Sequence, residues 1–293
     1  MTETVRIVET LRDAWQGLPR AVPTADKLAF ARRLVTAGFR RLDVGSFVSA
    51  SRVPAMADTG TVADGLPPGT PLRVTALVAN ESGLDRLLQH PRVDEVLFPF
   101  SLSERFQQRN TKLGRQEALA LVQRLAARSH AAGRTLYVTV SMAFGNNEGE
   151  PFDPAELRDW VARLEDAGAD RTGLADTTAQ ATPDGIRAVY AAVVSGRPGH
   201  AVPSAHLHVT EQNQAELVAA ALEAGVRDFD AALGGLGGCQ FAKGAVSNVS
   251  TWPLVRQVRA AGFVSEVPEP PLAELDGAAR ALAAASREAD VSS

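Results

Sequence analysis

Residues 24–47 read TADKLAFARRLVTAGFRRLDVGSF, and this stretch contains both repeating elements of the fold. Its first part, from Thr24 to Gly38, carries apolar residues three and four apart, which is the spacing of an amphipathic helix. Thr24 can cap the start of that helix, and Gly38 can end it because glycine adopts positive φ. The remainder, residues 40–47, reads as a short strand. The stretch therefore predicts a helix that turns directly into a strand.

The same turn recurs along the chain. Helical patterns end in V-T-A-G, S-H-A-A-G, L-E-D-A-G and L-E-A-G, each just before a strand. The expected strands are residues 5–12, 40–47, 72–79, 93–100, 134–143, 170–176, 203–209 and 227–233. Eight parallel strands with helical crossovers predict an α/β fold, the (β/α)8 TIM barrel. An open doubly wound sheet is the alternative, but no G-x-G-x-x-G follows the first strand.

The length of 293 residues fits one such barrel, so we expect a single domain over residues 1–293. The barrel should cover about residues 5–265. A tail at about 269–290 begins in V-P-E-P-P and continues as an alanine-rich amphipathic pattern. We expect this tail to form an additional C-terminal helix that packs outside the barrel.

Composition and charge exclude several classes of partner. Thirty basic and 34 acidic residues give a net charge of −4 without a long basic run, so nucleic acid is not an expected partner. No apolar run is long enough to span a membrane, and the first ten residues lack the pattern of a signal peptide. Cys239 is the single cysteine, which excludes an intramolecular disulfide and favours a reducing, cytoplasmic location.

Polar residues at the carboxyl ends of barrel strands are the candidates for chemistry, because active sites of this fold lie there. The first strand ends in Arg12 and Asp13, although an exposed ion pair would read the same way. His206 and His208 alternate with Leu207 and therefore point to one side, where both imidazoles could bind one metal ion. Two hydrogen-bonded interior histidines are the alternative.

Two further segments end or follow strands. Asp176 stands at the end of the sixth strand, where an aspartate before threonine is also a common helix cap. The glycine-rich residues 232–251 contain Cys239. This segment could bind phosphate with the help of the next helix, or it could be a lid that carries Cys239 over a substrate. An isolated cysteine is more often a small buried apolar residue.

Four segments together resemble the hydroxymethylglutaryl-CoA lyase family over about residues 5–265. They are L-R-D-A-W-Q at 11–16, S-F-V-S-A-S-R-V-P-A-M-A-D at 46–58, H-L-H-V-T at 206–210 and G-L-G-G-C-Q-F-A-K-G-A-V-S-N at 235–248. The resemblance implies that a divalent cation, Mg²⁺ or Mn²⁺, binds to Asp13, His206, His208 and Asn248. It implies catalytic roles for Arg12, Cys239, Asp176 and His206. We further assign Asp43, Trp15, Gln16 and Ser46 to the substrate pocket.

The reaction that the resemblance implies is retro-Claisen or retro-aldol cleavage of a 3-hydroxy-3-carboxyacyl thioester. The expected partner is thus a small acyl thioester, and a homodimer is one option for assembly. A related condensing synthase, or an aldolase acting on a specialised or carrier-bound substrate, is the nearest alternative. A barrel without catalysis that serves as a scaffold is the alternative from another class.

Three departures from the family pattern bear on the substrate. Relatives usually read R-D-G-L-Q where this chain has Trp15, so we expect the indole to lie beside the metal and arginine and to reshape the pocket. Residues 145–150 read G-N-N-E-G-E in place of G-C-P-Y-E-G, which changes the expected recognition of the acyl carrier. Thr251 is followed by Trp252 and Pro253 where relatives usually have Glu-Asp.

Overall fold

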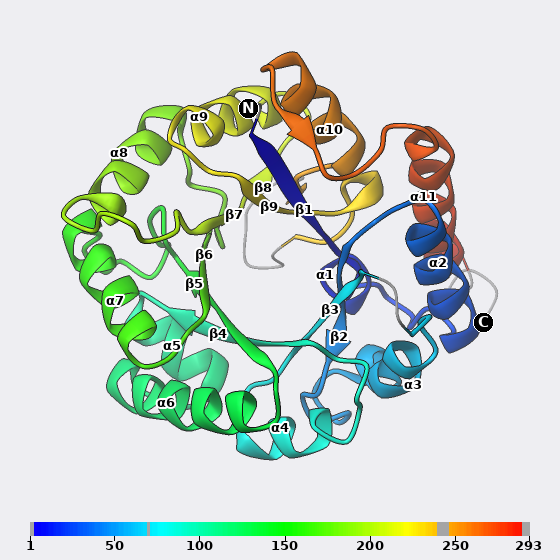
Figure 1. The fold of residues 1–293 in the computed structure, drawn as a ribbon, viewed down its shortest axis with the longest axis horizontal. Helices are drawn as coiled ribbons and strands as arrows, with labels where there is room; N and C mark the ends of the chain where they lie inside the picture. The colour runs from blue at the N-terminus through cyan, green and yellow to red at the C-terminus, as the bar shows by residue number, and fades with distance from the viewer. Residues whose placement is uncertain (1–2, 69–70, 239–245, 289–293) are drawn as a thin grey trace.

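Eight parallel strands form a closed barrel in the computed structural model, which describes residues 3–68, 71–238 and 246–288. The pairing of β1 with β9 closes the ring (Figure 1). The barrel strands are β1 (Thr4–Thr10), β2 (Arg41–Ser46), β3 (Arg73–Leu77), β4 (Glu95–Ser101), β5 (Thr135–Ser141), β6 (Arg171–Ala175), β7 (Ser204–His206) and β9 (Asp228–Ala231). The predicted TIM barrel is confirmed.

Helices surround these strands (Figure 1). The outer helices are α2 (Thr24–Thr36), α3 (Thr59–Asp64), α4 (Glu81–Leu87), α5 (Glu104–Thr111), α6 (Arg115–Ala131), α7 (Pro154–Asp166), α8 (Pro183–Val194), α9 (Gln214–Glu223) and α10 (Thr251–Ala260). Gly38, Gly133, Gly168 and Gly225 have φ angles of 98°, 70°, 103° and 91°. The four A-G endings of the sequence therefore turn the chain through positive φ, as predicted.

The start of α2 differs from the prediction. Thr24 is the first residue of the helix, and its hydroxyl donates to Asp58 Oδ2 at 2.8 Å instead of capping the backbone. Asp58 also accepts from the buried Lys27 Nζ at 2.7 Å. The Thr24 hydroxyl thus joins α2 to the segment that precedes α3.

The first strand is shorter than predicted. β1 ends at Thr10, and the chain continues directly into the short helix α1 (Leu11–Gln16). Leu11 and Trp15 are buried in the hydrophobic core. Arg12 and Asp13 are therefore placed by a helical turn at the end of β1, and not by the alternation of a strand.

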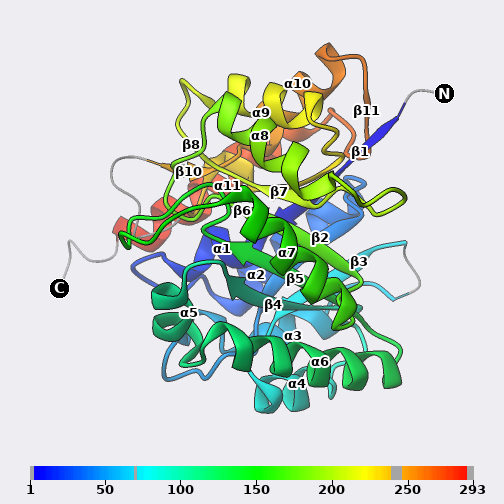
Figure 2. The same cartoon turned by 90° about the vertical axis from the view of Figure 1, so that its left-hand side faces the viewer.

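The seventh strand is broken at Leu207. Beyond it, β8 (His208–Val209) leaves the barrel and pairs antiparallel with β10 (Ser247–Asn248). Two 3₁₀ turns follow barrel strands: η1 (Pro54–Met56) comes after β2, and η2 (Leu233–Gly235) comes after β9. In Figure 2, β8 and β10 lie at the left-hand end of the barrel, opposite the N-terminus. The predicted continuous strand over 203–209 was therefore wrong in its second half.

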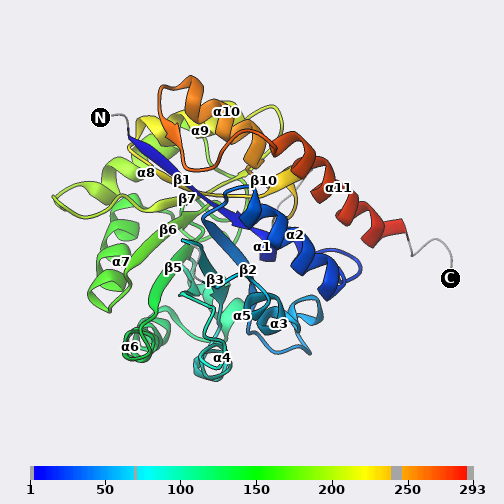
Figure 3. The same cartoon turned by 45° about the vertical axis from the view of Figure 1, so that its right-hand side comes forward.

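The C-terminal segment forms the predicted helix outside the barrel, α11 (Leu272–Glu288). Figure 3 shows it beside α2, after β11 (Val264–Ser265) has paired with the start of β1. Leu272 and Leu275 are buried, and Asp276 Oδ1 accepts from Gly234 N in η2 at 2.6 Å. Within the described residues, no helix is long and apolar enough to cross a membrane.

The strand interior toward the amino-terminal end is charged. Arg6 Nε donates to Asp228 Oδ1 at 2.6 Å, and Glu95 accepts from both Arg73 and Arg171 at 3.2 Å. Apolar side chains fill the space between strands and helices. The opposite end, where the strands finish, is the end that carries the candidate site.

Candidate metal centre and active site

Asp13, His206 and His208 meet at the carboxyl end of the barrel. One ligand atom from each residue can be chosen so that all three atoms lie within 4.8 Å of one another. The two imidazole rings are 5.2 Å apart between centroids. Two residues from β7 and β8 and one from α1, nearly 200 positions away in the sequence, thus share one site.

Asn248 lies against the same carboxylate. Its register partner in the β8–β10 pair is His208, and its Nδ2 donates to Asp13 Oδ2 at 2.7 Å. Gly238 N also donates to Asp13 Oδ2, at 3.3 Å, and Gln16 Nε2 donates to Asp13 Oδ1 at 3.0 Å. The four residues that the resemblance assigns to the metal are therefore in one place, and Gln16 contacts one of them.

The donor set fits a divalent cation. Both ring nitrogens of His208 are buried, and neither has a hydrogen-bond partner among the described residues. Burial, with a smaller contribution from His206, lowers the pKa of His208 to about 4, so that its imidazole is neutral near pH 7. Burial raises the pKa of Asp13, but Arg12 and His206 outweigh this and lower it. A neutral imidazole and an ionised carboxylate are the forms that bind metals.

His206 has a carboxylate partner that the sequence analysis did not identify. Its Nδ1 lies 3.2 Å from Asp230 Oδ2. Burial lowers the pKa of His206, but Asp230 outweighs burial and raises it. The D-F-D sequence at 228–230 could have indicated this residue, because alternation directs both aspartates into the barrel.

Arg12 is held at the site by Asp43. Arg12 Nε donates to Asp43 Oδ2 at 2.7 Å, and its Nη1 lies 3.5 Å from Asp13 Oδ1. Burial raises the pKa of Asp43 to about 6 although Arg12 opposes the rise, and Asp43 Oδ1 has no partner among the described residues. The guanidinium is thus buried beside the candidate metal ligands, with its charge partly balanced by two carboxylates.

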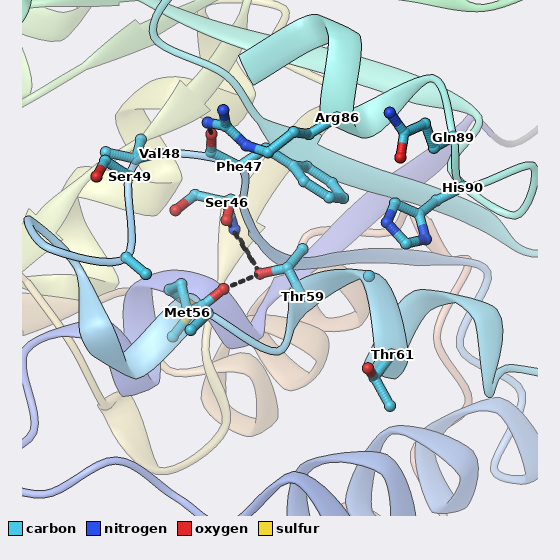
Figure 4. Close-up of a pocket in the computed structure, with 13 residues that line it drawn as sticks. Ser46, Phe47, Val48, Ser49, Met56, Thr59, Thr61, Arg86, Gln89 and His90 are labelled. Atoms are coloured by element: carbon cyan, nitrogen blue, oxygen red, sulfur yellow. Dashed lines mark hydrogen bonds between the residues drawn. The ribbon is translucent and has the colours of Figure 1, made fainter. Parts of the chain in front are cut away.

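Ser46 follows Asp43 on β2 and borders a cavity of about 470 Å³. Its buried hydroxyl has no hydrogen-bond partner in the described chain, and it points away from His90 across the cavity (Figure 4). Thr59 Oγ1 fixes the backbone by accepting from Ser46 N at 3.0 Å. The register shift between Asp43 and Gly45 is a bulge at this point of the strand. The cavity does not include the metal ligands.

Trp15, which the sequence assigned to the substrate pocket, is buried between α1 and α2. Only 1% of its surface is exposed, and its ring packs edge-on against Phe30 of α2 at 6.1 Å. The indole fills the hydrophobic core beneath α1. Trp15 thus joins α1 to α2 by packing, and its role in the substrate pocket stays a prediction.

Asp176 stabilises the turn after β6. Its Oδ1 accepts from Gln180 N at 2.8 Å and its Oδ2 accepts from Ala181 N at 3.1 Å. Burial raises the pKa of Asp176 to about 6 against these hydrogen bonds. The carboxylate thus binds backbone N–H groups of the turn, whereas the side chain of Thr182 caps the next helix, α8. The backbone N–H of Asp176 donates to His206 O at 2.9 Å.

The altered loop at 145–150 is anchored to α5. Glu148 accepts from Arg109 at 2.6 and 3.0 Å, and Arg105 Nη1 donates to Glu148 O at 2.7 Å. Asn146 Oδ1 accepts from the backbone of Glu148 and Glu150. The loop thus has its own set of polar contacts in place of the cysteine, proline and tyrosine usual in relatives. Cys239, the remaining predicted catalytic residue, lies outside the described residues.

The HMGL-like family model matches residues 4–272, which is most of the chain and includes every residue of this site. The chain belongs to the HMGL-like family. An (R)-citramalyl-CoA lyase of Chloroflexus aurantiacus is 33% identical over 86% of this chain and 83% of its own length. A 3-hydroxy-3-isohexenylglutaryl-CoA/hydroxy-methylglutaryl-CoA lyase of Pseudomonas aeruginosa is 32% identical over 86% and 83% of the two chains.

Solved structures of the HMGL-like family agree with the fold. The HMG-CoA lyase of Brucella melitensis has a TM-score of 0.88 and 31% identity, covering 96% of this chain and 99% of that one. An HMG-CoA lyase of Acinetobacter baumannii, in complex with coenzyme A and 3-methylmalate, has a TM-score of 0.87 and 29% identity, covering 96% and 92%. The relatives are named lyases, and the chain is an enzyme of this lyase family.

Proposed function

We propose that the chain is a divalent-metal-dependent lyase that cleaves a carbon–carbon bond in a 3-hydroxy-3-carboxyacyl-CoA thioester. The observation that carries the proposal is the meeting of Asp13, His206 and His208 within 4.8 Å, with Arg12 beside Asp13. The names of the relatives support a CoA thioester as substrate, since both curated lyases act on one. Mg²⁺ and Mn²⁺ suit the mixed oxygen and nitrogen donors, with Asn248 supplying an amide oxygen.

A bound divalent cation would supply a Lewis acid that lowers the pKa of the substrate hydroxyl. Arg12 would stabilise the negative charge that develops on the thioester oxygen as the carbon–carbon bond breaks. Its orientation is fixed before substrate arrives, because Asp43 accepts from Nε and Asp13 lies 3.5 Å from Nη1. Cys239 is our candidate for protonating the enolate carbon in its thiol form.

The base that removes the hydroxyl proton is either Asp176 or His206. Asp176 has a pKa of about 6, near the value that suits a base at neutral pH. His206 lies beside it in the neighbouring strand β7. A residue bound to the cation through Nε2 is a weaker base, which favours Asp176. Asp43 and Ser46 each have a buried polar atom without a partner among the described residues, so we assign both to binding the polar acyl end of the substrate.

Acetyl-CoA release tests this proposal. The purified protein, stripped of metal and then supplied with Mn²⁺, is mixed separately with hydroxymethylglutaryl-CoA and (R)-citramalyl-CoA. We expect acetyl-CoA from at least one of them, with metal required. A metal-loaded protein that cleaves neither thioester would contradict the proposed substrate class.

A second candidate is an aldolase or condensing synthase of the same metal group that uses another acyl carrier. The loop at 145–150 favours this candidate, because its sequence departs from the family pattern and its Glu148 and Asn146 make polar contacts with α5 and within the loop. Turnover of the same acyl group on a short thioester or a carrier protein, with none on CoA, would select this candidate. If the protein turned over no thioester at all, this would instead favour a non-catalytic barrel that serves as a scaffold.

Location and assembly are also proposals. The single cysteine is consistent with a reducing compartment, and we place the protein in the cytoplasm on that basis. A homodimer is our proposal for assembly, and light scattering of the purified protein tests it. The chain as a single domain predicts one cooperative unfolding transition.

A further inference from the structure

We propose that Asp230 is the positioning residue of His206, holding the ring so that Nε2 faces the cation. The inference deepens the metal site of the proposed function and depends on it. His206 ends β7 and Asp230 lies on β9, the neighbouring strand in the barrel. Asp230 Oδ2 is 3.2 Å from His206 Nδ1. A ring that donates its Nδ1–H to a carboxylate keeps the lone pair of Nε2 for a metal.

Asp230 is itself held in place from within the barrel. The hydroxyl of Tyr137 donates to Asp230 Oδ2 at 3.2 Å and lies 2.9 Å from Ser204 Oγ. The Arg171 guanidinium covers the Tyr137 ring at 3.7 Å. Gly173 leaves the room for this arrangement, because a Cβ at that position would lie 2.3 Å from the Tyr137 hydroxyl oxygen. The carboxylate therefore has a fixed position that it can impose on the imidazole.

The second histidine of the site, His208, is not paired with a carboxylate among the described residues. Neither ring nitrogen of His208 has a hydrogen-bond partner among the described residues, and no carboxylate is paired with it there. Asp230 thus acts on one histidine of the two. This asymmetry makes the role testable, since a change at Asp230 should be transmitted through His206 alone.

Asp228 provides a matched control. It lies two residues before Asp230 on the same strand and the same inward face. Its carboxylate pairs with Arg6, at the other end of the barrel interior. Asp228→Asn therefore removes one buried negative charge from β9 without touching His206.

Equilibrium titration of Mn²⁺, followed by the electron paramagnetic resonance of the free ion, measures the effect. We expect Asp230→Asn to weaken Mn²⁺ binding by roughly 10- to 100-fold, as loss of a carboxylate behind a ligating histidine does. Asp228→Asn should leave it within about twofold. In a His206→Gln background, which lacks the imidazole, Asp230→Asn should have no further effect. Equal weakening in both backgrounds would overturn the positioning role.

The tautomer of His206 provides a readout that is independent of turnover. The chain has five histidines, so proton–nitrogen spectra of histidine-labelled protein can be assigned by single substitutions. With Mg²⁺ bound, His206 should carry its proton on Nδ1, and Asp230→Asn should shift or broaden that signal while His208 is unchanged. An unaltered His206 signal in Asp230→Asn would refute the inference.

Two safeguards keep the test decisive. Should the wild type bind no Mn²⁺, the metal proposal fails, and the tautomer of metal-free protein in alkaline buffer still decides whether Asp230 orients His206. Should Asp230→Asn not fold, Tyr137→Phe removes one support of Asp230. That variant should weaken Mn²⁺ binding by less than the loss of Asp230, and again only while His206 is present. Unchanged binding in Tyr137→Phe would then count against the proposal.

Discussion

Arg12 is the residue whose position says most about the reaction. Its guanidinium is buried, its Nε is bound to Asp43, and Asp13, a proposed metal ligand, lies next to it. Burial alone would lower the pKa of Arg12, but Asp43 and Asp13 raise it, so the side chain is charged at neutral pH. A fixed positive charge of this kind can stabilise an enolate without rearranging.

Arg12→Met should fold and bind Mn²⁺ but lose turnover by about 10²- to 10³-fold, since one such donor contributes roughly 3 to 4 kcal/mol. The measurement is kcat for acetyl-CoA release, alongside the Mn²⁺ affinity. Arg124→Met, on the exposed surface of α6, controls for loss of an arginine. A kcat near that of the wild type in Arg12→Met would mean that the guanidinium does not act on the reaction.

The sequence predicted which residues come together better than it predicted the contacts around them. Asp13 and the two histidines were recognisable because the sequence pattern places them near predicted strand ends and because they fit a family pattern. Asp230 was not recognised, since its importance comes from a contact between β7 and β9 that only the folded barrel creates. The burial of Trp15 was not predicted, because the sequence does not say which side of a short helix faces the core.

Strands and helices differ from the prediction where pairing with a distant segment of the chain outweighs the local sequence pattern. Residues 203–209 alternate as one strand, yet the chain breaks at Leu207 because His208 pairs with Asn248, forty residues later. The regular parts of the fold followed from local rules, as the four positive-φ glycines at helix ends show. The sequence patterns of helix ends and buried strands occur many times along the chain and are therefore easy to recognise. The β8–β10 pair occurs once, and no repeated sequence pattern indicates it.

The bulge in β2 gives a prediction at the scale of one element. A Cβ on Gly45 would lie 2.2 Å from Thr59 Oγ1, the atom that holds Ser46 N. Gly45→Ala should therefore destabilise the protein by about 1 to 3 kcal/mol, as overpacking does. Gly277→Ala is the matched control, because it lies inside α11 with nothing within 4 Å of its Cβ. That change should stabilise by about 0.5 to 1 kcal/mol. Urea denaturation measures both, and equal effects would contradict the packing argument.

Glu9 joins β1 to two other elements and predicts a pH dependence of stability. Its carboxylate accepts from Leu233 N and from Thr251 Oγ1, both at 2.6 Å. Burial raises the pKa of Glu9 to about 8, against these two hydrogen bonds. The folded state thus binds the proton more tightly than the unfolded state, so its contribution to stability is present below pH 4.5 and is lost as the pH rises toward 8.

Glu9→Gln removes that titration while it keeps an acceptor for Leu233 N. The stability of the wild type relative to Glu9→Gln should fall between pH 5 and 8, with a slope of at most about 1.4 kcal/mol per pH unit, and then level off. Chemical denaturation at a series of pH values checks this. A difference that does not vary with pH would show that Glu9 is ionised in the folded protein throughout.

For the whole molecule, the order of strands and helices was predictable from the sequence. The closure of the strands into a barrel explains why the site residues meet. Parallel strands that follow one another around a ring bring every carboxyl end to one mouth, so residues from β1 to β10 can meet there. The C-terminal helix was predicted as well. The contact of this helix with η2, through Asp276 and Gly234, was not predicted, because an amphipathic pattern does not show which element the helix packs against.

Metal binding should stabilise the entire barrel, because the ligands come from both ends of the chain and the unfolded state does not bring them together. Mn²⁺ at about 100 times its dissociation constant should add roughly 2.7 kcal/mol to the free energy of unfolding and raise Tm by several degrees. Asp13→Asn should show little or no rise. Differential scanning calorimetry with and without Mn²⁺ makes the comparison, and the same rise in both proteins would place the ion elsewhere.

The central claim is that one cation binds between Asp13, His206, His208 and Asn248. An anomalous difference map from crystals grown with Mn²⁺ tests it most directly. The account predicts one strong peak per chain, within coordination distance of Asp13 and both imidazoles. A well-ordered mouth without a peak, or a peak bound to other residues, would contradict it.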